Sequence, residues 1–321
     1  SIDTLADKVD TCLLHVEQRA VLFSIGLAGV TCQNPEVKAL LRKHNRVVTL
    51  TRQSLAVHKQ IHDMQTAAGV PDHELLTTTR TKMTRWGNQY AQVSRNCLLR
   101  PALDPSVDKY KREHKGEKEA IVEVEEGDGA SKTGKPVSAA EIGLSASDWE
   151  ASQQLEGFLS YPFQIKETIE KRPYCTGAQA MALLHDLKQN FCNPNRYQEV
   201  KAFPDTLRMA DRARASEKLE CQDLDPMIDQ SRKVLREQLQ SRVFDLRPSN
   251  SRMVLCYMSK QMSCKHYFSD AQFVLAETLY QGALRKAEEI LADSTVMASP
   301  AAKKTKFDKP VDSESMLFRG S

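Results

Sequence analysis

The sequence predicts an all-α protein, a multi-helix body with an acidic, disordered linker in its middle and a disordered tail. Three observations support this fold class. The 321 residues include only 13 glycines and 13 prolines, about 8% against the ~12% of an average protein. Aromatic residues make up only 6%. Several segments repeat apolar residues at three- and four-residue spacing, and no run alternates apolar and polar residues as a half-buried strand does.

Composition also limits the class of protein. The net charge of +3 argues against a wholly basic nucleic-acid binder but permits a local basic face. Eight cysteines at irregular spacing do not form a disulfide framework, which favours an intracellular protein. No apolar run approaches the ~20 residues of a membrane span, so we expect no membrane partner. The chain opens at Ser1 rather than Met, and we expect it to be part of a longer protein.

Two helices are predicted in the first 70 residues. Residues 11–27 are mostly apolar and predict a short buried helix that ends near two glycines. Asn34 can cap a second helix, Pro35 suits its first position, and Gly69 can end it. Apolar residues recur through this segment at helical spacing, so we expect one long amphipathic helix. Its opposite face carries Lys38, Arg42, Lys43, Arg46, Arg52 and Lys59.

A loop over residues 70–84 precedes a helix that starts at Trp86 and has an apolar stripe through residues 90–98. Pro101 and Pro105 weaken helix formation there. Residues 108–129 contain five Lys/Arg and eight Asp/Glu, and residues 130–140 are rich in Ser, Gly, Lys, Ala and Pro. We therefore expect a flexible insertion over residues 110–143.

Helices resume at Ser147, which fits a capping box with Glu150 and predicts a helix to Lys171. Further helices are expected over residues 177–191, 203–244 with a break near Pro226, 253–262 and 271–291. The predicted organisation is thus a helical part over residues 1–109, the insertion over 110–143, a second helical part over 144–294 and a disordered basic tail over 295–321.

Three short stretches occur in an informative order. Cys12-Leu13-Leu14-His15 looks like a C-x-x-H motif, Thr84-Arg85-Trp86 looks like T-R-W, and residues 147–168 include Leu159, Pro162, Phe163 and Thr168 in the order L-x-x-P-F…T. Together they resemble the hAT superfamily of DNA transposases, over residues 10–290. The resemblance implies that this chain is the helical insertion-domain portion of such an enzyme.

The resemblance also implies a chemistry that this chain lacks the residues to perform. The family uses two Asp and one Glu to hold Mg²⁺ or Mn²⁺ for DNA cleavage and strand transfer. None of these carboxylates can be matched here, so we expect no catalytic residue and no metal site in this chain, and we expect the longer parent to form homo-oligomers through regions outside it. Gly87-Asn88 replaces the usual Asn-Ser, and Val254–Met258 lacks the usual Asp-Pro.

Trp86 and Arg85 are the sharpest candidates for contact with DNA. The resemblance implies that the Trp lies near the transposon end and stabilises a flipped base; stacking on an aromatic ring is worth ~1–3 kcal/mol per base. Arg85 can then neutralise a phosphate. The alternative is that Trp86 is a core anchor at the start of a helix and Arg85 is a solvated neighbour.

Basic residues nearby extend this candidate interface. Arg80 and Lys82 precede Arg85, and Arg42 and Arg46 belong to the basic face of the second helix. Contacts to several phosphates make binding steeply salt-dependent. A solvated helix surface is the alternative interpretation.

Cys12 and His15 have side chains that suit zinc, but no second pair lies nearby, and we favour packing at the entry to the first helix. Cys256, Cys264 and His266 are too irregularly spaced to complete a site. These residues are therefore expected to have a structural role.

The tail contains a candidate import signal. Residues 300–308, with Lys303, Lys304 and Lys306, resemble the Myc-type nuclear localisation peptide, which predicts a nuclear protein that binds an import receptor. The alternative is that these lysines are ordinary charges of a polar tail.

The leading hypothesis from the sequence is therefore a fragment of a hAT-like transposase that binds transposon-end DNA. The second is a domesticated, non-catalytic nuclear module that binds other proteins through its helices. The third is a degenerate transposon-derived reading frame with no selected role.

Overall fold

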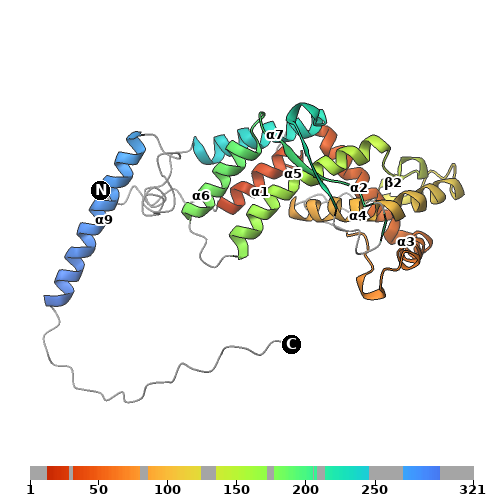
Figure 1. Ribbon diagram of the computed structural model, residues 1–321, viewed down its shortest axis with the longest axis horizontal. Coiled ribbons are helices and arrows are strands. Elements are labelled where there is room, and N and C mark those ends of the chain that lie inside the picture. Colours follow the sequence, from red (N-terminus) through yellow and green to blue (C-terminus); the bar gives the residue numbers. More distant parts are fainter. Residues whose placement is uncertain are drawn as a thin grey trace, which may run out of the picture.

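The structure, a computed structural model, describes residues 13–28, 32–79, 86–123, 135–171, 177–204, 206–207, 214–245 and 270–296 (Figure 1). Most of these residues are helical, as the sequence predicts. The expectation that strands are absent is wrong, because two short antiparallel hairpins occur in the described residues. The predicted helix over residues 253–262 and the tail after residue 296 lie outside them.

The described residues form eight α-helices. They are α1 (Leu13–Ser24), α2 (Pro35–Gln53), α3 (Leu55–Ala67), α4 (Trp86–Glu113), α5 (Ala146–Lys171), α6 (Gly177–Asp186), α7 (Pro226–Leu239) and α9 (Asp270–Val296). Short 3-10 helices are η2 (Asp72–Glu74), η3 (Ala139–Glu141) and η6 (Cys221–Asp223), and π-helical turns are η4 (Leu187–Phe191) and η7 (Gln240–Phe244). The strands are β1 (Ile121–Glu123), β2 (Lys135–Val137), β3 (Gln198–Lys201) and β4 (Ser216–Leu219).

Helix α2 begins as predicted but ends early. The Asn34 side chain accepts a hydrogen bond from the Val37 amide at 3.2 Å, and Pro35 occupies the first turn. The single long helix of the prediction is wrong at Ser54, whose extended backbone ends α2. The Ser54 hydroxyl then accepts a hydrogen bond from the Val57 amide at 3.3 Å and caps α3. The row of cations is therefore divided between two helices.

Helix α4 continues through both prolines to Glu113, beyond the predicted boundary at residue 109. An interior proline removes a backbone hydrogen bond and is costly in an isolated helix. Here burial offsets that cost, because Leu99, Ala102 and Leu103 around the prolines are at most 1% exposed. Tertiary packing overrides the local preference.

The predicted flexible insertion is folded at both ends. Strands β1 and β2 pair in antiparallel register, with Ile121 opposite Val137, and both side chains are 2% exposed. Strand β1 packs on α2, where the Gln53 side chain donates to the Val122 carbonyl and accepts from its amide, both at 3.2 Å. The prediction is wrong here because a few apolar residues, spread among many charges, are enough to attach the segment. Residues 124–134 lie outside the described residues.

Helix α5 starts earlier than predicted. The capping residue is Ser145, whose hydroxyl accepts from the Asp148 amide at 3.1 Å, while Asp148 accepts from the Ser145 amide at 2.9 Å. The proposed Ser147–Glu150 box is therefore wrong. The helix then runs through Pro162 to Lys171, as predicted.

The β3–β4 hairpin packs on α5 where the helix carries Gly157. A Cβ atom at Gly157 would lie 2.2 Å from the Glu199 carbonyl oxygen, so only glycine permits this approach. Beside it, Arg214 and Glu156 form a buried ion pair at 2.7 Å. The prediction of helix over 203–244 is wrong before Pro226, which is the first residue of α7 and is capped by Asp225.

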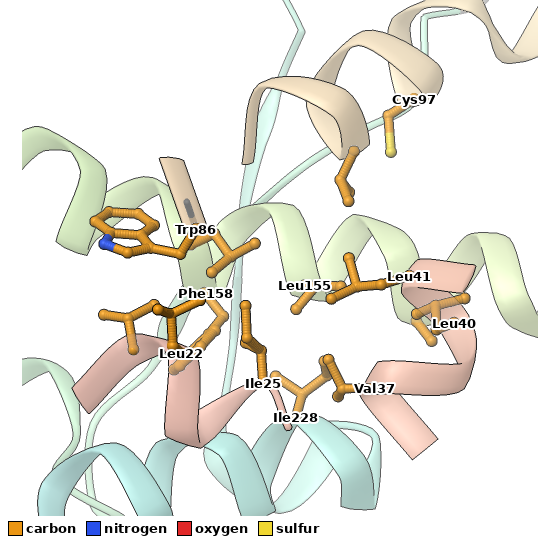
Figure 2. Packing of buried hydrophobic residues seen from close by; sticks show 14 of the residues in the cluster. Leu22, Ile25, Val37, Leu40, Leu41, Trp86, Cys97, Leu155, Phe158 and Ile228 are labelled. Atoms are coloured by element: carbon orange, nitrogen blue, oxygen red, sulfur yellow. The ribbon is translucent and has the colours of Figure 1, made fainter. Parts of the chain in front are cut away.

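The core brings both predicted helical parts into one hydrophobic cluster. Helix α1 packs between α7 and α5, and α4 packs along α5 (Figure 1). Figure 2 shows side chains from these helices and from α2 pointing toward one another. Its labelled residues are Leu22, Ile25, Val37, Leu40, Leu41, Trp86, Cys97, Leu155, Phe158 and Ile228. Each large apolar side chain buried in this way stabilises the fold by about 1.5–3 kcal/mol.

Candidate functional site

Trp86 lies in the core and not on a surface open to DNA. It is the first residue of α4, its side chain is 1% exposed, and its ring meets the Phe163 ring edge-on at 6.2 Å and 88°. A base stacks only on an exposed aromatic face. The base-stacking role is therefore corrected to that of a core anchor, the alternative that the sequence left open.

The indole Nε1 of Trp86 is buried and has no hydrogen-bond acceptor among the described residues. The second tryptophan differs, because Trp149 Nε1 donates to Asp104 Oδ1 at 2.7 Å. An unpaired buried donor costs ~1–3 kcal/mol, so Trp86 contributes through its apolar surface alone. Arg80, Lys82 and Arg85, which precede it, lie outside the described residues.

The basic face of α2 is partly neutralised. Lys43 Nζ lies 2.8 Å from Asp148 Oδ2 at the start of α5. The charge of Arg46 reaches Glu141, whose pKa lies below its usual value mainly because the Ser138 amide and hydroxyl donate to it, with Arg46 and Lys135 adding to the effect. Arg42 is exposed on the same helix. The face is thus more mixed in charge than its sequence suggests.

A buried carboxyl group was not predicted from the sequence. Glu17 on α1 is 0% exposed, and neither of its carboxylate oxygens has a hydrogen-bond partner in the described part of the chain. Burial raises its pKa well above the usual value, while Lys166 lowers the pKa and Glu170 raises it. The sequence does contain a signal for this buried group, because Glu17 is the only acidic residue in the largely apolar segment that forms α1. Burial of this group lowers the stability of the fold.

A second buried polar group, His44, has both ring nitrogens paired. Asn96 Nδ2 can only donate, so His44 Nδ1 accepts from it at 3.0 Å, and Nε2–H donates to Ser152 Oγ at 2.8 Å. Burial lowers the pKa of His44 to about 4, although the charge of Asp148 acts in the opposite direction. The neutral ring therefore joins α2, α4 and α5 through hydrogen bonds.

The described residues do not fit a catalytic metal. They contain no group of three or more His, Cys, Asp or Glu side chains placed to hold an ion. His15 is exposed on α1, while Cys12, Cys256, Cys264 and His266 lie outside the described residues. A set of donors for Mg²⁺ or Mn²⁺ is thus not found in this part of the chain, and no chemical step is assigned to it.

A cleft lined by three cationic and two acidic side chains was also not predicted. It has a volume of about 620 Å³ and lies between η4, the second half of α7 and η7. We call it the η4–α7 cleft. Its lining consists of Lys188, Gln189, Lys233, Arg236, Glu237, Gln240 and Asp245. The residues come from two segments about 45 positions apart, so no spacing rule could reveal the cleft.

No protein-family model, curated protein or solved structure matches this chain. None of the helices in the described residues is long and apolar enough to cross a membrane. The candidate import residues Lys303, Lys304 and Lys306 lie outside the described part of the chain. The resemblance to hAT transposases stays a prediction that rests on the three sequence motifs.

Proposed function

We propose that the chain is the helical DNA-binding part of a hAT-like transposase, or of a domesticated descendant, and that it binds transposon-end DNA. One observation carries the proposal: segments that hold the three motifs meet in one core. Trp86 of the second motif packs on Phe163 of the third, and α1, which includes His15 of the first, packs on α4 and α5. This meeting supports the interpretation of the motifs as parts of one unit.

The buried position of Trp86 changes how DNA is bound in this proposal. The indole anchors the start of α4, and the phosphate contacts fall to the cations that precede it in sequence, Arg80, Lys82 and Arg85. Arg42 and Arg46 of α2 add charge. Such contacts position DNA without reading its sequence.

The test is fluorescence anisotropy with labelled duplex and hairpin DNA at 50 and 200 mM salt. Replacement of Arg80, Lys82 and Arg85 by Gln is expected to weaken binding and to reduce the slope of log affinity against log salt, by about 0.9 for each phosphate that the variant no longer neutralises. Trp86 is left unchanged, so the core is preserved. The matched control replaces Arg112, Lys115 and Lys118, at and beyond the other end of α4, by Gln.

Equal affinity of both triple variants for DNA refutes the assignment of phosphate contacts. A flat salt response of the unchanged chain refutes DNA binding altogether. Catalysis is proposed only for a longer parent that supplies the Asp/Asp/Glu set, and it predicts metal-dependent strand cleavage only when that longer chain is assayed.

The second candidate is a nuclear helical module that binds proteins and has lost transposition. The neutralisation of Lys43 by Asp148 favours it, because a paired lysine is less available to phosphate. It predicts no salt-dependent DNA affinity. For either candidate we propose nuclear import through Lys303, Lys304 and Lys306; replacement of the three by Ala in a fluorescent fusion is expected to abolish nuclear accumulation, and an unchanged distribution refutes it.

A further inference from the structure

The η4–α7 cleft is built where two π-helical turns face each other. Lys188 and Gln189 belong to η4, and Gln240 belongs to η7. The two turns are joined directly, because Lys188 Nζ donates to Gln240 Oε1 at 2.6 Å. π-Helical turns are rare in proteins, and those that occur are often found at functional sites. Two such turns at the same cleft make this cleft a candidate for a binding site.

Lys188 presents a fixed cation to this cleft. Its Nζ lies 4.2 Å from the centre of the Phe244 ring, and the residue is 7% exposed. Burial lowers the pKa of Lys188, the charge of Arg236 lowers it further, and Asp245 raises it. An ammonium has three N–H donors, and among the described residues only Gln240 accepts from it. Two donors therefore lack an acceptor in this part of the chain.

Arg236 adds a second cation to the cleft. It is exposed on α7, and its side chain forms no hydrogen bond or ion pair with the described residues. The lining also holds two carboxylates, Glu237 and Asp245, and Asp245 accepts a hydrogen bond from Gln240 Nε2 at 2.5 Å. The third cation of the lining, Lys233, is paired with Asp229 at 2.6 Å. Lys188 comes from η4 and Arg236 from α7, so two cations line one cleft, and an anion between them offsets their mutual repulsion.

We propose that the η4–α7 cleft binds a phosphate group, with Lys188 and Arg236 as its charged ligands. Guanidinium donates to phosphate oxygens in a bidentate fork, and the ammonium acts as a point charge beside it. The cleft volume of about 620 Å³ also leaves room for a nucleotide-sized ligand. The phosphate belongs to a free nucleotide or to the terminal phosphate of a DNA strand. The site uses none of the cations proposed to bind the DNA backbone and does not rest on that proposal.

The test is isothermal titration calorimetry with inorganic phosphate in chloride buffer at constant ionic strength. The unchanged chain is expected to bind phosphate saturably, and Arg236→Gln is expected to weaken binding at least tenfold. Arg236 is exposed, so its substitution leaves the fold intact, which circular dichroism and the Tm check. The matched control is Arg112→Gln, which removes a second exposed arginine at the far end of α4 and is expected to change nothing.

Two further variants change the charge of the lining in opposite directions. Lys188→Met keeps most of the buried stem and removes the positive charge, and it is also expected to weaken phosphate binding at least tenfold. Glu237 lines the same cleft, and its carboxylate repels a phosphate, so Glu237→Gln is expected to tighten binding. Weaker binding by Glu237→Gln contradicts the proposed position of the phosphate.

Two further probes separate the sources of phosphate. Tighter binding of AMP than of inorganic phosphate identifies a nucleotide site, whereas a preference for an oligonucleotide with a 5′-phosphate over the same strand with a 5′-hydroxyl identifies a DNA end.

Absence of saturable phosphate binding by the unchanged chain overturns the proposal. Equal affinities of Arg236→Gln and Arg112→Gln also overturn it. The triple variant of Arg80, Lys82 and Arg85 is expected to retain full phosphate affinity, so failure of the DNA-binding proposal and failure of the cleft proposal are distinguishable.

Discussion

His44 makes the stability of the fold sensitive to acid. Its neutral ring is enclosed between Asn96 and Ser152, and burial lowers its pKa from 6.5 to about 4. The unfolded chain therefore takes up a proton at a pH where the folded chain does not. Because the folded pKa is the lower one, the contribution of His44 to the free energy of unfolding is complete above pH 6.5 and is lost as the pH falls toward 4.

The size of this effect follows from the two pKa values. Each tenfold change in the protonation equilibrium is worth ~1.4 kcal/mol, so the full loss is about 3 kcal/mol, of which about 2.5 kcal/mol is reached at pH 4.5. Urea denaturation at pH 7.5 and 4.5 measures it. His44→Gln lowers stability at pH 7.5 but is expected to lose about 2.5 kcal/mol less than the unchanged chain on acidification. The contributions of the other titrating groups are the same in the variant and in the unchanged chain, so they cancel in this comparison.

The matched control is His58→Gln, on the exposed side of α3, which is expected to follow the pH profile of the unchanged chain. The ring protons of His44 in an NMR titration report the pKa directly. A titration near pH 6.5 refutes the reasoning and means that Asn96 presents its oxygen, not its nitrogen, to the ring. Parallel pH profiles of His44→Gln and the unchanged chain refute it equally.

Substitutions at three further positions, Glu17, Trp86 and Gly157, test the core. Burial raises the pKa of Glu17, so its cost grows as the pH rises above the unfolded value; Glu17→Gln should therefore gain stability over the unchanged chain between pH 4 and pH 8 in urea denaturation, and a constant difference contradicts this. Trp86→Ala should cost about 3–5 kcal/mol and Trp86→Phe clearly less; an unchanged denaturation midpoint for the alanine variant contradicts the anchor role. Gly157→Ala should cost about 1–3 kcal/mol because its Cβ meets the Glu199 carbonyl, whereas Gly282→Ala, with open space around it, should not destabilise the fold.

Features set by neighbouring residues could be predicted from the sequence. The start of α2 is an example, because a cap such as Asn34 and the proline after it act within one turn. The break at Ser54 could not be predicted, because the apolar stripe continues across it into Val57 and Ile61. An apolar stripe indicates which side of a helix is buried, but it does not indicate where one helix ends and the next begins.

Features that depend on residues far apart could not be predicted. Ile121 and Val137, which are 16 positions apart, become a strand pair only in the folded chain, where β1 packs on α2. The motif at Trp86 identified an important residue, but a sequence does not distinguish an indole that faces DNA from one that faces Phe163. The η4–α7 cleft combines Lys188 with Arg236, which no spacing rule connects.

The hairpin of β1 and β2 has a consequence for how this chain can vary. Glu123 and Lys135 are partners in the antiparallel pair, so the backbone leaves the body and returns to it at one place. The entropic free-energy cost of closing a loop rises only slowly with loop length, by about 0.6 kcal/mol for each doubling. Segments of very different length, even a whole guest domain, can thus be inserted between Glu123 and Lys135 while Ile121 stays against α2 and Val137 stays paired with Ile121.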